Sequence, residues 1–229
     1  MSWWTLPRKP EPEAMNDSDE VEAYSSAAAQ AYLDSIDNTL VDQIAGLGIT
    51  RGRLLDIGTG PGGIPLKVAQ RMPEMKVVGV DFSANMIRAA KKSAVEQGLD
   101  GRAIFQVADG KRLCFADSTF DIVISNSVLH HLENPAPFFN EMARVVKPQG
   151  AVLLRDLRRP SRLAFPLHVR WFGRYYSGLM KKLYVDSVHA AYTGRELSGL
   201  LQGSALADAR LFFHERTHLG FVWTQKGQA

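Results

Sequence analysis

Short apolar segments alternate with segments of helical periodicity over residues 50–157, and this alternation limits the fold more than any other feature. The apolar segments are RLLDIG, KVVGVD, AIFQVAD, FDIVISN and GAVLLRDL. Strands that alternate with helices predict a parallel sheet with helices on both faces. The C-terminal segments ARLFFHERTH and GFVWTQK predict an antiparallel hairpin. We therefore expect an α/β fold with a seven-stranded, mostly parallel sheet.

The 229 residues fit one α/β domain with additions at its periphery. We divide this single domain (1–229) into an N-terminal arm and helix (1–47), a core (50–157), an insertion (158–192) and a closing helix with strands (193–229). The arm's helix is expected at about 18–47, where apolar residues recur at helical spacing.

Composition indicates a reducing, cytoplasmic location. The single cysteine, Cys114, excludes an intramolecular disulfide and a multi-cysteine metal site. We expect no secretory signal and no membrane span, because no apolar run approaches the roughly 18 residues that a span needs. The net charge of +3 is too small to indicate nucleic-acid binding by itself.

A glycine-rich loop, in RLLDIGTGPGGIPLKVAQ, lies between the first strand and the following helix. It reads as G-x-G-x-x-G from Gly58 to Gly63, or as D-x-G-x-G-x-G from Asp56 to Gly62. Either reading lets the backbone approach a ligand at the helix N-terminus. Asp81, at the end of the next strand, is placed to bind ribose hydroxyls. These residues predict a ribose-containing cofactor without choosing which one.

Five motifs in order resemble those of the class I S-adenosylmethionine (SAM) dependent methyltransferases. They are DIGTGPG (56–62), VDFSANM (80–86), VADGKRLCFADSTFD (107–121), ISNSVLHHL (124–132) and KPQGAVLLRD (147–156). The resemblance implies a Rossmann-like fold, SAM as methyl donor, S-adenosylhomocysteine (SAH) as product and no metal. It is to the small-molecule branch, similar to the enzymes of ubiquinone and menaquinone biosynthesis. NSVL replaces the N-P-P-Y or D-P-P-Y of base methylases, so nucleic acid is disfavoured as the acceptor.

The same resemblance implies the cofactor-binding residues. They are Asp56, Gly58, Thr59, Gly60, Gly62, Asp81, Phe82, Met86, Asp109, Gly110 and Asn126. The glycines would border the amino-acid end of SAM, and Asp81 would bind the ribose diol. Phe82 and Met86 would flank the adenine, whose amino group would meet Asp109. Asn126 would contact the methionine moiety beside the transferring methyl group.

The catalytic candidates are His131, near the mouth of the site, and Tyr24, on the N-terminal helix. Adjacent side chains point to opposite sides of a helix or strand, so His130 and His131 are not expected to chelate one metal ion. The sulfonium already activates the methyl group, so most of the catalysis is expected from positioning. A base is needed only if the acceptor must lose a proton.

The basic, aromatic stretch 158–184 has two interpretations: a solvated helix pair that packs on the sheet, or a substrate lid after the fifth strand. In a lid, Arg158 would bind a carboxylate or phosphate, and Trp171 and Tyr175 would contact an aromatic or lipid-like acceptor. The lysines near the end of the stretch would suit contact with anionic lipid head groups. A small-molecule acceptor that is anionic, aromatic or lipid-like is therefore expected.

Two other function classes stay open at this point. The literal G-x-G-x-x-G pattern fits an NAD(P)-dependent oxidoreductase, which NAD binding would support. A non-catalytic SAM-binding or regulatory module would bind SAM without turnover, although the intact glycines and acids of the motifs disfavour it. Transfer of a methyl group from SAM to a small molecule is the preferred interpretation.

Overall fold

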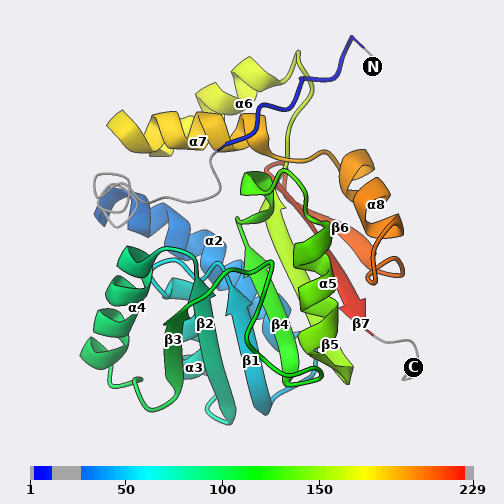
Figure 1. Cartoon of the computed structure of the whole chain (residues 1–229). Helices are drawn as coiled ribbons and strands as arrows, with labels where there is room; N and C mark the ends of the chain where they lie inside the picture. The colour runs from blue at the N-terminus through cyan, green and yellow to red at the C-terminus, as the bar shows by residue number, and fades with distance from the viewer. Residues whose placement is uncertain (1–2, 12–26, 225–229) are drawn as a thin grey trace.

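The computed structural model describes residues 3–11 and 27–224 (Figure 1). Tyr24, one of the two predicted catalytic residues, lies outside the described residues. Among the described helices, none combines the length and the apolar character needed to cross a bilayer.

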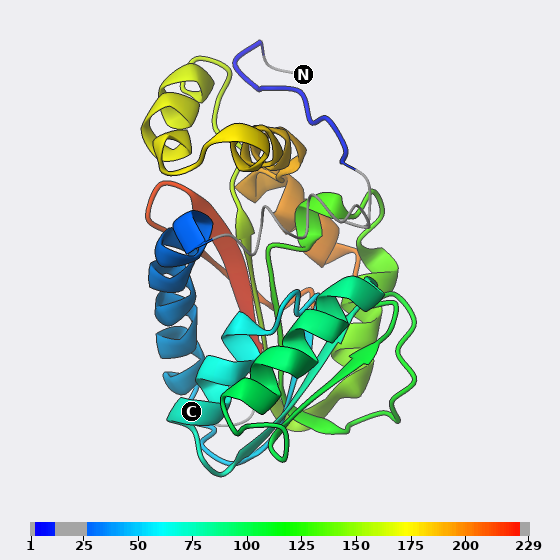
Figure 2. The same cartoon turned by 90° about the vertical axis from the view of Figure 1, so that its left-hand side faces the viewer.

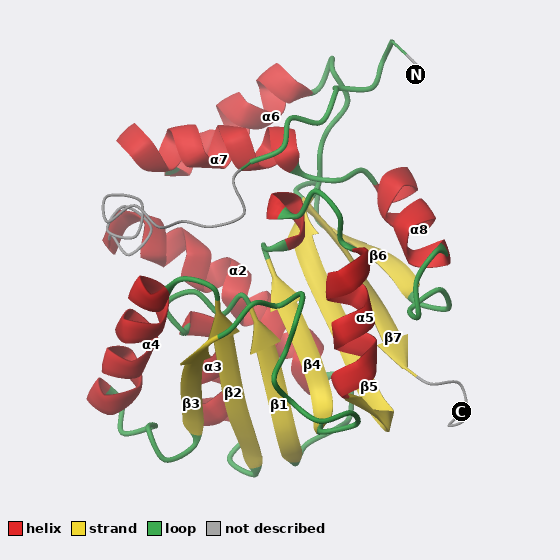
Figure 3. Cartoon of the chain, in the orientation of Figure 1, coloured by secondary structure: helices red, strands yellow, loops and turns green. Residues whose placement is uncertain are grey.

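Seven strands form one sheet in the order β3-β2-β1-β4-β5-β7-β6 (Figure 3). The strands are β1 (Gly52–Ile57), β2 (Met75–Asp81), β3 (Ala103–Val107), β4 (Phe120–Asn126), β5 (Val146–Leu157), β6 (Arg210–His214) and β7 (His218–Thr224). The first five pair in parallel, and β7 is antiparallel to both β5 and β6. The predicted fold class, including the closing hairpin, is confirmed.

Helices cover both faces of this sheet. They are α2 (Ala27–Ala45), α3 (Gly63–Arg71), α4 (Ala84–Glu96), α5 (Ala136–Val145), α6 (Phe165–Phe172), α7 (Gly178–Ala190) and α8 (Gly194–Gln202), with single 3₁₀ turns η1 (Leu129–His131) and η2 (Gly173–Tyr175). Because side chains alternate along a strand, Leu54 packs with α2, α3 and α4, whereas Leu55 packs with α5 and α8. Both faces of the parallel strands are therefore buried, as their continuous apolar sequences predict.

The element boundaries differ from the sequence prediction mainly at β5. This strand begins at Val146 rather than Gly150, because α5 ends at Val145 and the chain passes directly into the sheet. The pairing of β4 with β5 shifts register between Phe120 and Ile122, which accommodates the extra residues.

Residues 158–192 lie between β5 and α8 in the chain and form α6, η2 and α7 beyond the carboxyl ends of the parallel strands (Figures 1 and 2). The arm 3–11 runs against this insertion. Arg8 Nε donates a hydrogen bond to the carbonyl oxygen of Ala190 at 2.6 Å, and Thr5 forms an isolated β-bridge with Ser161. We call α6, η2, α7 and residues 3–11 together the cap.

Phe139 on α5 provides a test of the core. It is fully buried, and its ring meets that of Phe221 edge-to-face with centroids 5.6 Å apart. Phe139→Ala is expected to lower the free energy of unfolding by about 3–5 kcal/mol, because it removes buried surface and leaves a cavity. Urea denaturation measures this change. Val95→Ala, at an exposed position of α4, should stay within about 0.5 kcal/mol of wild type. Equal effects of the two changes would contradict the described packing.

Candidate functional site

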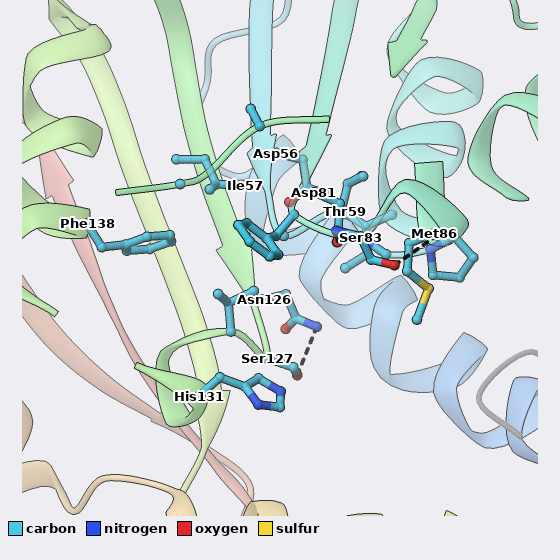
Figure 4. A pocket seen from close by; sticks show the side chains of 18 of the residues that line it. Asp56, Ile57, Thr59, Asp81, Ser83, Met86, Asn126, Ser127, His131 and Phe138 are labelled. Carbon is cyan, nitrogen blue, oxygen red and sulfur yellow. Dashed lines mark hydrogen bonds between the residues drawn. The ribbon is translucent and has the colours of Figure 1, made fainter. Parts of the chain in front are cut away.

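A cavity opens at the carboxyl ends of β1, β2 and β4 (Figure 4). All the residues predicted to bind the cofactor line it except Gly62. They are Asp56, Gly58, Thr59, Gly60, Asp81, Phe82, Met86, Asp109, Gly110 and Asn126. A Cβ atom on Gly62 would lie 3.0 Å from the Cβ of Ala90, so this glycine lets the loop pack against α4. Residues spread over about 70 positions of the chain thus meet where ligands bind in open α/β sheets.

The backbone of the glycine loop distinguishes between its two readings. Gly58, Gly60 and Gly62 have φ angles of +77°, +53° and +86°, in the left-handed region. Gly63 instead begins α3 and has no positive φ. A Cβ atom on Gly58 would lie 2.1 Å from Cγ2 of Val128, so no side chain fits there. The loop therefore follows the D-x-G-x-G-x-G frame.

Asp81 fixes this loop to the end of β2. Its Oδ2 accepts a hydrogen bond from the Gly60 N–H at 2.8 Å, and its Oδ1 accepts one from the Ser83 N–H at 2.8 Å. Burial raises the pKa of Asp81, and these two amides oppose the shift. The carboxylate oxygens keep further lone pairs, which suits them to accept hydrogen bonds from a ribose diol.

Two more carboxyl groups line the cavity beside the loop. Burial raises the pKa of Asp56 to about 7, and the charges of Asp81 and Asp37 add to the shift. Burial likewise raises the pKa of Asp37 to about 6, and the ammonium of Lys67 opposes it. Sequence analysis did not identify Asp37 as a site residue. The only local indication is that this acid follows the apolar Ile36 in the N-terminal helix. Once ionised, these groups favour a cationic ligand.

Asn126 sits at the end of β4 and is held by Arg155. Its Oδ1 accepts a hydrogen bond from Arg155 Nε at 3.0 Å, and its Nδ2 donates to Ser127 Oγ at 3.2 Å (Figure 4). Arg155 is fully buried, and burial lowers its pKa to about 10. It also donates to Thr39 Oγ1 at 2.8 Å and to the Ile36 carbonyl at 3.1 Å. Arg155 therefore ties β4 and β5 to α2 while it remains charged at neutral pH.

A second cavity adjoins the first and shares Asp37, Asn126, Ser127 and His131 with it. Its remaining lining residues are Ile36, His130, Leu157, Tyr176, Met180, Leu183, Tyr184, Ser187, Thr217 and His218. Tyr176 directly follows η2, and the lining residues from Met180 to Ser187 belong to α7, so the insertion covers this cavity. Burial lowers the pKa of His218 to about 3, so this imidazole is neutral at neutral pH. Among the described residues, the lining contains no Lys or Arg.

His130 forms a buried pair with Asp156, which follows Arg155 on β5. His130 Nδ1 lies 2.6 Å from Asp156 Oδ1, and the His130 N–H donates to Asp156 Oδ2 at 3.2 Å. Burial opposes protonation of His130, but Asp156 and Glu11 raise its pKa above the ordinary value. Burial would raise the pKa of Asp156, yet the charge and hydrogen bonds of His130 hold it below its usual range. Sequence analysis did not pair these two residues.

The expectation that His130 and His131 point apart is wrong. They lie in η1, where successive residues are separated by about 120° instead of the 180° of a strand. Their ring centroids are 4.2 Å apart, and Glu11 Oε2 lies 3.7 Å from His130 Nε2 and 3.7 Å from His131 Nδ1. One ligand atom from each residue lies within 4.8 Å of the others, so these three could hold a divalent ion.

The structure brings none of the predicted acceptor residues Arg158, Trp171 and Tyr175 to either cavity. The Arg158 guanidinium lies 5.3 Å from the ring centroid of Phe213. Trp171 is 60% exposed, and Arg174 Nη2 donates a hydrogen bond to Tyr175 Oη at 2.7 Å. The insertion instead contributes Tyr176 and residues of α7 to the second cavity, a choice that helical spacing alone does not specify.

Residues 55–154 match a family model described as "Methyltransferase domain". The ubiquinone/menaquinone biosynthesis C-methyltransferase of Desulfotalea psychrophila is 32% identical over 158 residues, which are 69% of this chain and 63% of that protein. The 27-O-demethylrifamycin SV methyltransferase of Amycolatopsis mediterranei is 33% identical over 128 residues, 55% of this chain and 47% of that protein. The chain thus spans less than two thirds of these relatives.

Solved structures agree on the fold. A SAM-dependent methyltransferase from Aquifex aeolicus aligns with a TM-score of 0.64 at 16% identity, over 91% of this chain and 98% of that one. A plantazolicin methyltransferase solved with SAH aligns with a TM-score of 0.65 at 17% identity, over 90% and 87%. Residues 55–154 therefore match the methyltransferase domain family, and the chain shares its fold with SAM-dependent methyltransferases. It resembles the methyltransferases of ubiquinone and menaquinone biosynthesis.

The raised pKa values of Asp56 and Asp37 predict pH-dependent binding. Between pH 5.5 and 8 both carboxyls lose protons and gain negative charge, so SAM, with its sulfonium, should bind about tenfold more tightly at pH 8. SAH lacks the sulfonium and should respond less. Calorimetric titration at both pH values measures the difference, and Asp56→Asn should reduce it. An unchanged pH response in that variant would contradict the role of Asp56.

Proposed function

We propose that this chain transfers the methyl group of SAM to a small, uncharged acceptor that occupies the second cavity. The observation that carries the proposal is the meeting of the two cavities at Asn126, Ser127 and His131. A cofactor on the glycine loop and an acceptor beneath α7 would face each other across these residues. In-line transfer mainly requires that the nucleophile is held near the methyl group with water excluded.

In the first cavity, Asp81 would bind the ribose diol, and the loop from Asp56 to Gly60 would surround the amino-acid end of SAM. Phe82, Met86 and Asp109 would contact the adenine. The charge of Asp56 and Asp37 supports this orientation, because it places carboxylates where a SAM ligand would bring its ammonium and sulfonium. The positive charge of the sulfonium disappears on methyl transfer. These carboxylates would therefore attract the product SAH less strongly than SAM.

In the second cavity, the lining narrows the acceptor class. Aromatic and apolar side chains such as Tyr176, Met180 and Leu183 favour an aromatic or lipid-like molecule. The absence of Lys and Arg from this lining disfavours the anionic acceptor expected from Arg158. We therefore narrow the expectation to an uncharged molecule with a hydroxyl or similar nucleophile.

The His130–Asp156 pair would take the proton that such a nucleophile releases. Asp156 contacts Nδ1 of His130, and Nε2, which lies 3.7 Å from Glu11 Oε2, would take the acceptor's proton. His131 lines both cavities and would orient the acceptor near the methyl group. The nucleophile then bonds to the methyl carbon as the carbon–sulfur bond breaks, and SAH is released. Tyr24 stays a prediction, as does the division of the chain at residues 47, 158 and 193.

Titration of the chain with SAM, SAH and NAD tests the cofactor assignment. SAM and SAH should bind with dissociation constants in the micromolar range, and Asp81→Ala should weaken both by roughly 100-fold, the loss of two charge-assisted hydrogen bonds. Asp100→Ala, at an exposed acid that lines neither cavity, is the matched control and should bind as wild type. Binding of NAD alone would support an oxidoreductase instead. SAM binding without turnover on any acceptor would support a regulatory module.

The His130 pair predicts a pH profile for methyl transfer. His130 must be neutral to accept a proton, so kcat/KM should rise with pH through an apparent pKa above 6.5. Glu11→Gln removes a charge that raises the pKa of His130, so it should move the profile to lower pH. His130→Ala should lower kcat by about 100-fold or more and leave SAM affinity unchanged.

SAH formation with a panel of phenols and quinols, measured from pH 5.5 to 9, provides this profile. His214→Ala is a matched control, since His214 lines neither cavity and should not alter the profile. Loss of activity with a chelator, restored by one divalent ion, would assign Glu11, His130 and His131 to metal binding and contradict the base role. An unshifted profile in Glu11→Gln would also contradict it.

A further inference from the structure

The outer side of the cap exposes a group of large apolar side chains. They are Trp3, Trp4, Leu163, Leu167, Trp171, Tyr175 and Leu179, between 38% and 70% exposed. We call these residues the outer cap face. Trp4 adjoins the insertion because its carbonyl accepts a hydrogen bond from the Arg162 N–H at 2.9 Å. Leu167 and Trp171 are one helical turn apart on α6 and share a face. The arm and α6 lie at the same end of the molecule (Figure 2), and both carry exposed apolar side chains.

The part of the insertion from residue 158 to residue 185 carries positive charge and no acidic side chain. Exposed cations flank the apolar side chains: Arg162, Arg170, Arg174, Lys181 and Lys182. The sequence contains no Asp or Glu from residue 157 to 185. Within the described parts of the chain, no ion pair joins any of these five cations to an acid. Among residues 3–11 and 27–224, their charge is thus not neutralised by an ion pair.

Exposed apolar side chains elsewhere do not combine in this way. Val95 lies on α4, Ile104 and Val107 on β3, and Phe213 on β6, apart from the cap. Single exposed apolar residues are ordinary, whereas contiguous ones mark an interaction surface. Tryptophan and leucine mixed with arginine and lysine fit the boundary of a bilayer, where the rings enter the interface and the cations meet lipid phosphates.

We propose that the outer cap face binds the surface of an anionic lipid bilayer. Trp3, Leu167 and Trp171 enter the head-group region, and the flanking cations bind the phosphates. Helix α7 lies between this surface and the second cavity: Leu179 is exposed, whereas Met180 and Tyr184 line the cavity. If the chain transfers a methyl group as proposed, the cap would admit a lipid-like acceptor from the bilayer. Binding to the bilayer itself does not depend on that function.

Co-sedimentation with vesicles tests the proposal on the full chain. The test vesicles contain phosphatidylcholine with about 30% phosphatidylglycerol as the anionic lipid. They should retain at least about tenfold more protein than vesicles of phosphatidylcholine alone. About 0.5 M salt should weaken the binding. Leu163→Glu with Leu167→Glu should abolish it, because two acids then face the lipid. Val95→Glu is the matched control, since it introduces an acid at an equally exposed apolar position on α4.

Calorimetric SAM binding by each variant separates the possible failures. The double variant should bind SAM as wild type does, which shows that it folds and that the cofactor site is intact. Equal loss of vesicle binding in the double variant and in Val95→Glu would overturn the proposal. Absence of binding to anionic vesicles would also overturn it, even if the cap were found to bind an acidic protein. If the wild-type chain does not bind SAM, the proposed function is contradicted, whereas the conclusion on bilayer binding is unaffected.

Discussion

The arrangement of the site depends on one buried charge, the guanidinium of Arg155 at the carboxyl end of β5. Transfer of such a group from water is costly, as the lowered pKa shows, so the structure must provide partners for it. It donates hydrogen bonds to Asn126, Thr39 and Ile36, and the negative charge of Asp37 lies nearby. These partners come from α2 and β4, and two of them, Asp37 and Asn126, line both cavities. Loss of the guanidinium would leave the Asn126 carbonyl without its donor and leave Lys67 as the remaining cation beside Asp37.

Other charges along the same edge of the sheet are paired in the same manner. Asp81 is held by two backbone amides, and Asp156 by the imidazole and backbone of His130. In each case a strand of apolar residues ends in a charged group whose partner belongs to a neighbouring loop. Because a buried charge without its partner is strongly destabilising, each pair disfavours loop positions in which the partner is absent. The rigid positions that a transfer reaction needs arise from this pairing.

The sequence predicted the features that depend on local pattern. The strands, the glycine loop and Asp81 follow from short apolar runs between helical segments, from turn chemistry and from fixed spacing between neighbouring motifs. Glu11 and the α2 partners of Arg155 escaped prediction, because their contacts join residues about 120 positions apart. The His130–Asp156 pair escaped because helix α5 and most of β5 separate the two residues in the chain. Such contacts arise from the folded topology, and no local pattern records them.

The insertion shows a different limit of local reasoning. Helical spacing establishes that Leu167 and Trp171 share one side of α6, and that Met180 and Tyr184 share one side of α7. It does not establish which side faces the cavity, because both sides are apolar and aromatic. A helix that is apolar on more than one side is normally covered on each of them. In α7, Met180, Leu183 and Tyr184 line the second cavity, whereas Leu179 in the first turn is exposed. On α6, Leu167 and Trp171 share a side that is exposed to solvent. These uncovered apolar groups are the physical reason to expect a partner beyond the chain, and the surrounding cations define the charge that the partner must carry.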